Sequence, residues 1–189
     1  NENETSASYV EIGTDGDSGT LNNRGSLTVD GSILVSQGML NNLTQDAVVT
    51  GGAMQVGQGP DENGLVNAIV NNQGTIELSG IMNVLQDGQV QNAGTISAAS
   101  GNIQGTVENS GTLDIRSTLK VQQGGSLDNS GTTTVAGDIV VAEDARLKNS
   151  GEVAVNGKFD LSGIFEQDAG SFVANETQLA GSVVINGGY

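Results

Sequence analysis

Apolar and polar residues alternate in short segments along this chain, and small turn residues separate the segments. Leu113 and Ile115, for example, share one side of an extended segment, whereas Thr112 and Asp114 share the other. Alternation with a period of two indicates β-strands that bury one face. The pattern therefore predicts an all-β protein built of short strands.

One turn motif recurs: an Asn, any residue and a Gly, followed in most copies by Thr or Ser and an apolar residue. Successive motif glycines from Gly74 to Gly151 are 20, 17, 20 and 20 residues apart. The corner glycines are Gly25, Gly74, Gly94, Gly111, Gly131 and Gly151, and Gly170 stands at the same point of a divergent copy. The chain is therefore predicted to consist of repeats of about 20 residues.

Two further turn positions keep step with this motif, so each repeat is predicted to hold three short strands and three turns. The second turn is marked by Gly31, Gly80, Gly101, Ser117, Gly137 and Gly157, and the third by Gly38, Gly88, Gly105, Gly124, Asp144, Gly163 and Gly181. Such a repeat predicts one coil of a parallel β-helix, in which each strand pairs with its equivalent in the next coil. Parallel crossover connections are right-handed, so a right-handed β-helix (β-solenoid) is expected.

About eight coils are expected over residues 19–181. Residues 1–18 are expected to form an acidic segment with a partial coil, in which residues 8–12 make a lone strand, and residues 182–189 to form a terminal edge strand. One repeat is longer than the others, which places an inserted loop near residues 58–65.

An antiparallel meander or sandwich is the structural alternative. Asp30-Gly31 and Asn156-Gly157 lie between apolar runs and would also suit tight hairpin turns. A meander has no need to keep three turn positions in phase over successive copies, so the pattern favours the β-helix.

The motif Asn shares strand parity with the apolar residue two positions before it, so it is expected to point inward at a corner. Stacked side-chain amides can donate to and accept from one another, which satisfies polar groups that are costly to bury. The expected ladder consists of Asn23, Asn42, Asn72, Asn92, Asn109, Asn129 and Asn149. Each corner glycine is expected to supply a positive φ.

Composition narrows the classes of function. Six Lys and Arg against 22 Asp and Glu give a formal net charge of −16, and the basic residues form no patch, so we expect neither nucleic acid nor anionic membranes as partners. The absence of Cys and His excludes thiol chemistry, thiolate or imidazole zinc sites and His-dependent triads. No apolar run reaches the about 18 residues of a membrane span, so no membrane insertion by this segment is expected.

Two acidic stretches are candidate functional sites. Asp15 and Asp17 lie in the Gly-rich stretch TDGDSGT and are candidate calcium ligands, although the stretch fits no EF-hand and a solvated acidic terminus is the alternative. Asp61 and Glu62 lie in the inserted loop and are candidate recognition residues, because insertions on solenoids often carry function. No other cofactor is predicted.

Polysaccharide lyases and polygalacturonases also use β-helices, but their sites cluster carboxylates with basic residues around a groove. This chain has no Asp-Asp pair, no His and no expected aromatic platform for a sugar, so we expect no enzymatic activity. A polysaccharide-binding or polysaccharide-cleaving module remains the alternative outside the structural class. Phe159, Phe165 and Phe172 fall in the last two coils and are expected in the core.

The runs LNNRGSLTVDG, VNNQGTIELSG, VQNAGTI, VENSGTLDI and LKNSGEVAVNG resemble the β-helical passenger regions of bacterial surface adhesins, namely autotransporters and filamentous-haemagglutinin-like proteins of two-partner secretion. The resemblance is one of repeat style. It implies a secreted or cell-surface protein of a Gram-negative bacterium that acts in adhesion, self-association or biofilm formation, with copies of itself or host or bacterial surface ligands as partners. The alternative is a homopolymeric extracellular filament subunit, joined end to end by stacking or exchange of β-strands.

Overall fold

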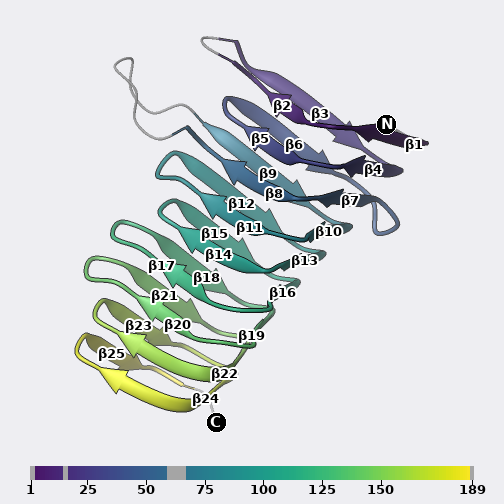
Figure 1. Cartoon of the computed structure of the whole chain (residues 1–189). Helices are drawn as coiled ribbons and strands as arrows, with labels where there is room; N and C mark the ends of the chain where they lie inside the picture. Colours follow the sequence, from purple (N-terminus) through teal and green to yellow (C-terminus); the bar gives the residue numbers. More distant parts are fainter. Residues whose placement is uncertain (1–2, 15–16, 59–66, 188–189) are drawn as a thin grey trace.

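The computed structural model describes residues 3–14, 17–58 and 67–187 of the chain. Within these ranges all regular secondary structure consists of β-strands, and all pairings between named strands are parallel. Through most of the chain a strand pairs with the strand three places further on, because each coil contributes three strands (Figure 1). The protein is a parallel β-solenoid, and parallel pairing excludes the antiparallel meander.

Equivalent strands of successive coils stack into three columns. The first column follows the Asn-x-Gly turn, which we call the ladder corner. It contains β1 (Glu4–Ala7), β4 (Ser26–Val29), β7 (Val48–Gly51), β10 (Thr75–Leu78), β13 (Thr95–Ala98), β16 (Thr112–Ile115), β19 (Thr132–Val135) and the first halves of β22 (Glu152–Leu161) and β24 (Ser171–Leu179).

The second column follows the second turn of each coil. It contains β2 (Val10–Ile12), β5 (Ser32–Val35), β8 (Ala53–Val56), β11 (Ile81–Val84), β14 (Ser100–Ile103), β17 (Leu119–Val121), β20 (Ile139–Val141) and the second halves of β22 and β24. The two columns belong to one sheet because β22 and β24 run through both of them.

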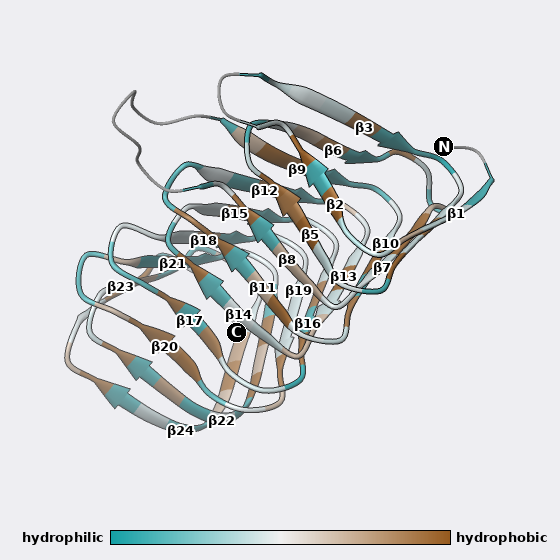
Figure 2. Ribbon diagram, turned by 45° about the horizontal axis from the view of Figure 1, so that its top comes forward, coloured by the Kyte–Doolittle hydropathy of each residue, from teal (hydrophilic) through white to brown (hydrophobic). Residues whose placement is uncertain are grey.

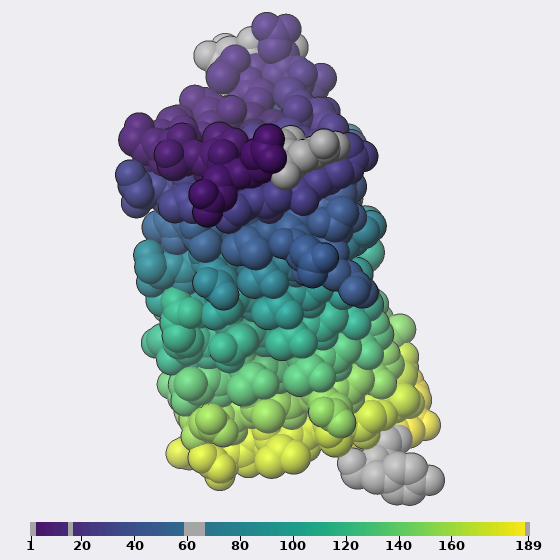
Figure 3. All heavy atoms as spheres, turned by 90° about the vertical axis from the view of Figure 1, so that its right-hand side faces the viewer, coloured from purple at the N-terminus to yellow at the C-terminus, as the bar shows by residue number. Residues whose placement is uncertain are grey.

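The third column follows the third turn and leads back to the ladder corner. It is a nine-stranded sheet of β3 (Gly19–Asn23), β6 (Gly38–Asn42), β9 (Ala68–Asn72), β12 (Gly88–Asn92), β15 (Thr106–Asn109), β18 (Ser126–Asn129), β21 (Arg146–Asn149), β23 (Ile164–Gln167) and β25 (Ser182–Ile185). The solenoid thus has about nine turns rather than the eight expected, because segments outside the predicted repeat range also stack. Figure 3 shows the coils as successive layers of one rod.

The core lies inside the coils, where in-register pairing stacks apolar residues of one coil on those of the next. Val49, Ile76, Ile96 and Leu113 occupy successive levels of the first column and are fully buried. Burial of one such side chain contributes about 1.5–3 kcal/mol. Figure 2 shows the alternation of hydrophobic and hydrophilic residues along the strands that produces this arrangement.

Two predicted second turns differ in detail from the others. Gly157 lies within β22, which continues from the first column into the second with a register shift between Val155 and Lys158. Gly101 lies inside β14 and is buried, because the chain turns two residues earlier, at Ala99.

The two ends of the solenoid differ in what they expose. At the N-terminal end the acidic segment supplies β1 as well as β2, so the prediction of a lone strand is wrong; Thr5 and Ala7 pair with Leu27 and Val29. At the C-terminal end β24 and β25 each pair with one described strand only, and Ile185 is 70% exposed.

Three phenylalanines close the core below this C-terminal edge. Phe159 and Phe165 are buried and Phe172 packs against them, with ring centroids 4.7–5.4 Å apart. The coils before them hold only aliphatic and methionine side chains in the apolar core. The aromatic rings fill the last full coils, as the sequence led us to expect.

Candidate functional site

The inward asparagines of the third column form one continuous column of amides. In each link, Nδ2 of one Asn donates to Oδ1 of the Asn in the next coil, over 2.7–2.9 Å. All are at most 2% exposed, and each is the last residue of its strand. The members are Asn23, Asn42, Asn72, Asn92, Asn109, Asn129 and Asn149, so the structure brings together every residue of the predicted ladder.

Each amide also ties the ladder corner to the next coil. Nδ2 of Asn129, for example, lies 3.1 Å from the carbonyl oxygen of Gly131 and 3.0 Å from that of Glu152. The carbonyl of Gly131 also accepts from the backbone N–H of Glu152, so the amide adds a second hydrogen bond to a corner that backbone pairing already joins to the next coil. A net hydrogen bond of this kind contributes about 0.5–1.5 kcal/mol. The ladder is therefore a structural element, and its polar atoms are not available to a ligand.

The corner glycines are required for a different reason from the one predicted. Among the predicted corner glycines only Gly170 has a positive φ, of 68°. At Gly131, a Cβ atom would lie closer than 3.0 Å to the backbone of Ser110 and Gly111 in the preceding coil. The same conflict with the neighbouring backbone occurs at Gly74, Gly94, Gly111 and Gly151. Glycine is needed because the stacked corners leave no room for a side chain.

The ladder ends in a residue that the motif search missed. Asn149 Nδ2 donates to Oε1 of Gln167 at 3.0 Å, and Gln167 Nε2 donates back to the carbonyl of Ala169 in its own turn. In the next coil the equivalent position is Ile185. Strand parity identifies Gln167, since it follows Phe165 by two residues.

A second inward polar residue supports the ladder from the first column. Thr133 is fully buried in β19, where neighbouring levels carry Leu113 and Val153. Its hydroxyl donates to Oδ1 of Asn129 at 2.9 Å. Alternation within the run TTTV places this threonine inward, but its partner becomes evident only from the structure.

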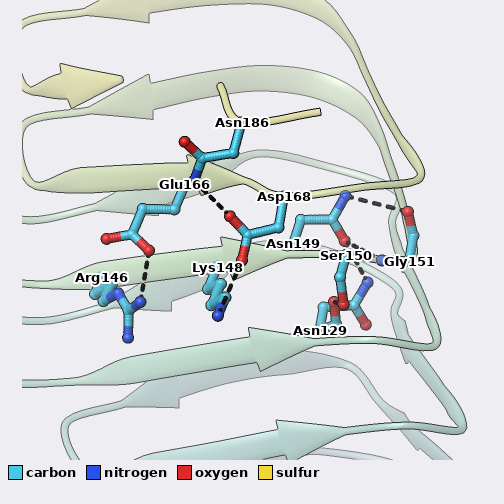
Figure 4. A network of polar contacts seen from close by, with 9 residues as sticks. All are labelled: Asn129, Arg146, Lys148, Asn149, Ser150, Gly151, Glu166, Asp168 and Asn186. Carbon is cyan, nitrogen blue, oxygen red and sulfur yellow. Dashed lines mark hydrogen bonds and ion pairs between the residues drawn. The ribbon is translucent and has the colours of Figure 1, made fainter. Parts of the chain in front are cut away.

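Outward side chains near the C-terminal end form ion pairs (Figure 4). Arg146 pairs with Glu166 at 2.5 Å, and Lys148 pairs with Asp168 at 3.0 Å. Asn186 also donates to Asp168, at 2.7 Å. The hydrogen bonds from Asn186 and Lys148 lower the pKa of Asp168, while the hydrogen bond to Asp168 raises the pKa of Lys148.

Outward amides at the opposite end of the third column bond to one another. Asn41 donates to Asn22 and Asn71 donates to Asn41, each at 2.8 Å. Further along the same row, Glu108 and Asp128 line a shallow cavity of about 740 Å³ beside the ladder corner. This cavity is polar and carries two carboxylates.

A different cavity, of about 330 Å³, lies on the outer face of the second column, over β2 to β14. Its lining includes the half-exposed ring of Tyr9 and the amides of Gln55, Asn83 and Asn102. We call these four residues the outer strip. Partial burial and the nearby carboxylate of Glu11 raise the pKa of Tyr9, so its hydroxyl remains protonated near neutral pH. The sequence analysis did not single out this exposed ring.

The acidic candidate sites from the sequence do not come together. Asp15, Asp61 and Glu62 lie outside the described residues. The backbone of Asp17 forms two hydrogen bonds with that of Thr14, which closes a tight turn. Within residues 3–14, 17–58 and 67–187, no three acidic side chains gather in a way that could hold a metal ion.

No helix in the described ranges is long and apolar enough to cross a bilayer. Comparison of the chain with protein-family models, curated protein sequences and solved structures finds no match. Functional inference therefore rests on the solenoid and its surfaces.

Proposed function

We propose that the chain is a non-enzymatic, extracellular β-solenoid that serves as a structural and adhesive element of a bacterial surface. It would be secreted or displayed by a Gram-negative cell and act in adhesion, self-association or biofilm formation. The repeat style noted in the sequence supports this assignment, because it is the style of surface adhesin passengers.

The observation that carries the proposal is the unbroken stacking of all nine strands of the third column, reinforced by the buried amide ladder. A rod of this kind pairs its backbone groups from coil to coil, so few segments can open independently for a protease. Its net charge of −16 opposes side-by-side aggregation of such rods, while leaving contacts between their ends open.

Display of the chain on a non-adherent Gram-negative strain tests this function. We expect cells that carry it on an outer-membrane anchor to be retained under flow on abiotic or host-cell surfaces better than cells with the anchor alone. The Leu113→Asp variant buries a charge in the core and is the unfolded control. Equal retention by cells with the chain and cells with the anchor alone would contradict the proposal.

A filament subunit is the second candidate function. It is favoured by the apolar edge of β24 and β25, where Leu179 and Ile185 face the core side but are 56% and 70% exposed. Stacking of β1 to β3 of another copy onto this edge would bury both residues and continue the strand pairing. Electron micrographs of the purified chain should then show long fibres, and only monodisperse monomers across salt and calcium conditions would count against it.

A further inference from the structure

The outer strip is an uncharged window on a strongly acidic chain. All ten residues that line its cavity are uncharged. Charged residues flank the window in the same row of outward positions: Glu11 precedes Leu34 and Lys120 follows Asn102 in register. The face of β2, β5, β8, β11 and β14 that carries it is turned toward the viewer in Figure 2. The cavity lining offers no charge to a ligand, and the nearest carboxylate, that of Glu11, is hydrogen-bonded to the Tyr9 hydroxyl, so the chemistry of the window favours a neutral ligand.

Two of the three amides of the strip, Asn83 and Asn102, are open to a ligand, whereas Gln55 Nε2 donates to the carbonyl of Gly57 at 3.1 Å. Gln55, Asn83 and Asn102 stand in register on adjacent strands, as Asn22, Asn41 and Asn71 do in the third column. The third-column amides bond to one another. In the described part of the chain, neither Asn83 nor Asn102 makes a side-chain hydrogen bond. Each therefore presents both a donor and an acceptor outward.

The exposed ring of Tyr9 supplies the other half of the recognition chemistry. It lies at the N-terminal end of the cavity and is 48% exposed. An aromatic face stacks on an apolar surface, while its hydroxyl hydrogen-bonds at the edge. Sugar rings offer both an apolar C–H face and a rim of hydroxyls. Amides on successive coils repeat every ~4.8 Å along the rod, a spacing close to the length of one ring in an extended polysaccharide.

From these features we propose that Tyr9, Gln55, Asn83 and Asn102 bind a neutral polysaccharide that lies along the solenoid axis. Tyr9 stacks on one sugar ring, and the amides of Asn83 and Asn102 exchange hydrogen bonds with hydroxyls of rings further along the chain. The inference rests on the proposed adhesive function, for which it supplies a ligand class and a surface.

Titration of the purified full chain with uncharged hexasaccharides of cellulose, xylan and mannan tests the proposal. We expect saturable binding to at least one of them, with shifts of the Asn83 and Asn102 side-chain amide signals in NMR spectra. Hexamers of galacturonate and of glucosamine are the charged arms and should leave these signals unmoved. Binding of the charged hexamers alone, or no shift at these amides with any neutral hexamer, overturns the proposal.

Variants separate the contributions of the ring and the amides. Tyr9→Ala should weaken the Kd about tenfold, the usual scale for loss of a well-packed aromatic contact. Tyr9→Phe keeps the ring and should bind within about threefold of the wild type. Asn83→Ala with Asn102→Ala should also weaken binding about tenfold, since it removes two hydrogen-bonding groups. The matched control, Gln73→Ala with Gln91→Ala, changes two outward amides of the other cavity and should leave the Kd unchanged.

Failure of this inference is distinguishable from failure of the adhesive function. If displayed wild-type chain retains cells but no neutral hexasaccharide binds, the strip proposal alone is overturned. If the hexasaccharide binds and the variants weaken it as expected, the strip proposal stands even where displayed chain fails to retain cells.

Discussion

The ladder corner and the third turn lie at opposite ends of the same third-column strands, yet they differ in how much their length and residues vary from coil to coil. At the ladder corner between β18 and β19, Ser130 and Gly131 both donate to the carbonyl of Asn109, and the same pair of bonds recurs from coil to coil. The third turn has two residues between β14 and β15 but four between β17 and β18. Between β8 and β9 it extends over residues 57–67.

The difference follows from what each turn touches. The ladder corner presses its backbone and an inward amide against the corner of the neighbouring coil, which favours a short connection. It has two residues in every coil except between β6 and β7, where it has five, and between β23 and β24, where it has three. The third turn also packs on its neighbour at one point, since a Cβ at Gly105 or Gly125 would lie within 2.5 Å of a backbone oxygen of the preceding coil. Other positions of the third turn are open. Gly124 in this turn has no atom within 4 Å of where a Cβ would stand. The greater uniformity of the ladder corner from coil to coil, compared with the third turn, is thus a physical consequence of stacking.

Insertions should give the largest difference in unfolding free energy between the two turns. A Gly-Ser insertion between Ser130 and Gly131 should lower the free energy of unfolding by about 4 kcal/mol, because it displaces the corner from both neighbouring amides. The same insertion between Gln123 and Gly124 should cost about 0.6 kcal/mol, the entropy of a longer loop. Urea denaturation measures both values, and equal losses would refute the comparison.

Addition of one methyl group is the next most damaging change. Gly131→Ala forces a Cβ against the backbone of the preceding coil and should cost about 3 kcal/mol in unfolding free energy. Gly124→Ala meets no atom, but its φ is 77°, so it should cost about 1–2 kcal/mol. Thermal denaturation ranks the two variants, and a greater loss for Gly124→Ala would be inconsistent with the steric role of Gly131.

Removal of one ladder amide should have a smaller effect. Asn129→Ala leaves Nδ2 of Asn109 and Oδ1 of Asn149 without their ladder partners and should lower the unfolding free energy by about 2 kcal/mol. Binding to the outer strip should be unchanged, since β18 lies in another column. Gln123→Ala in the third turn is the matched control, because this amide only contacts exposed Asp144, and it should change stability by less than about 0.5 kcal/mol.

The smallest effect on stability is expected at Asp168, in the turn between β23 and β24. Asp168 has a lowered pKa in the folded chain, so its contribution is present above its unfolded value near 3.8 and is lost as pH falls through the folded pKa. Asp168→Asn should therefore lower stability slightly at pH 7 and not at about pH 2. The effect of Asn129→Ala should be the same at both pH values, because amides do not titrate. A loss at pH 2 equal to that at pH 7 for Asp168→Asn would contradict the role of its charge.

Much of the fold is predictable from the sequence because stacking copies local information from coil to coil. The spacing of the Asn-x-Gly motif indicates the period, and strand parity places Leu127 and Asn129 inward, where both are fully buried. The reason for glycine at the corner was not predictable, since the atoms that exclude a Cβ at Gly131 belong to residues about one repeat away. The change of direction at Gly157 lies within one continuous strand, because β22 pairs with β24 on both sides of the register shift between Val155 and Lys158.

The outer strip was not predicted from the sequence for the same reason, since its residues lie far apart along the chain. Tyr9, Gln55, Asn83 and Asn102 carry no shared motif and are spread over five coils of the second column. Only the register of the strands brings them to one face. A sequence read one repeat at a time sees a lone tyrosine and scattered amides, whereas a reading down the outward positions of the column would have found the strip.

Gln167 donates to its own turn and not to the next coil, so the resistance of the solenoid to force differs along its length. Up to β23 every coil is fastened to the next by backbone pairing and by a side-chain amide, but β25 carries Ile185 at that position and is held by backbone pairing and apolar contact alone. Under tension we expect the coils to separate more easily between β23 and β25, where this amide link is missing, than between the coils before them.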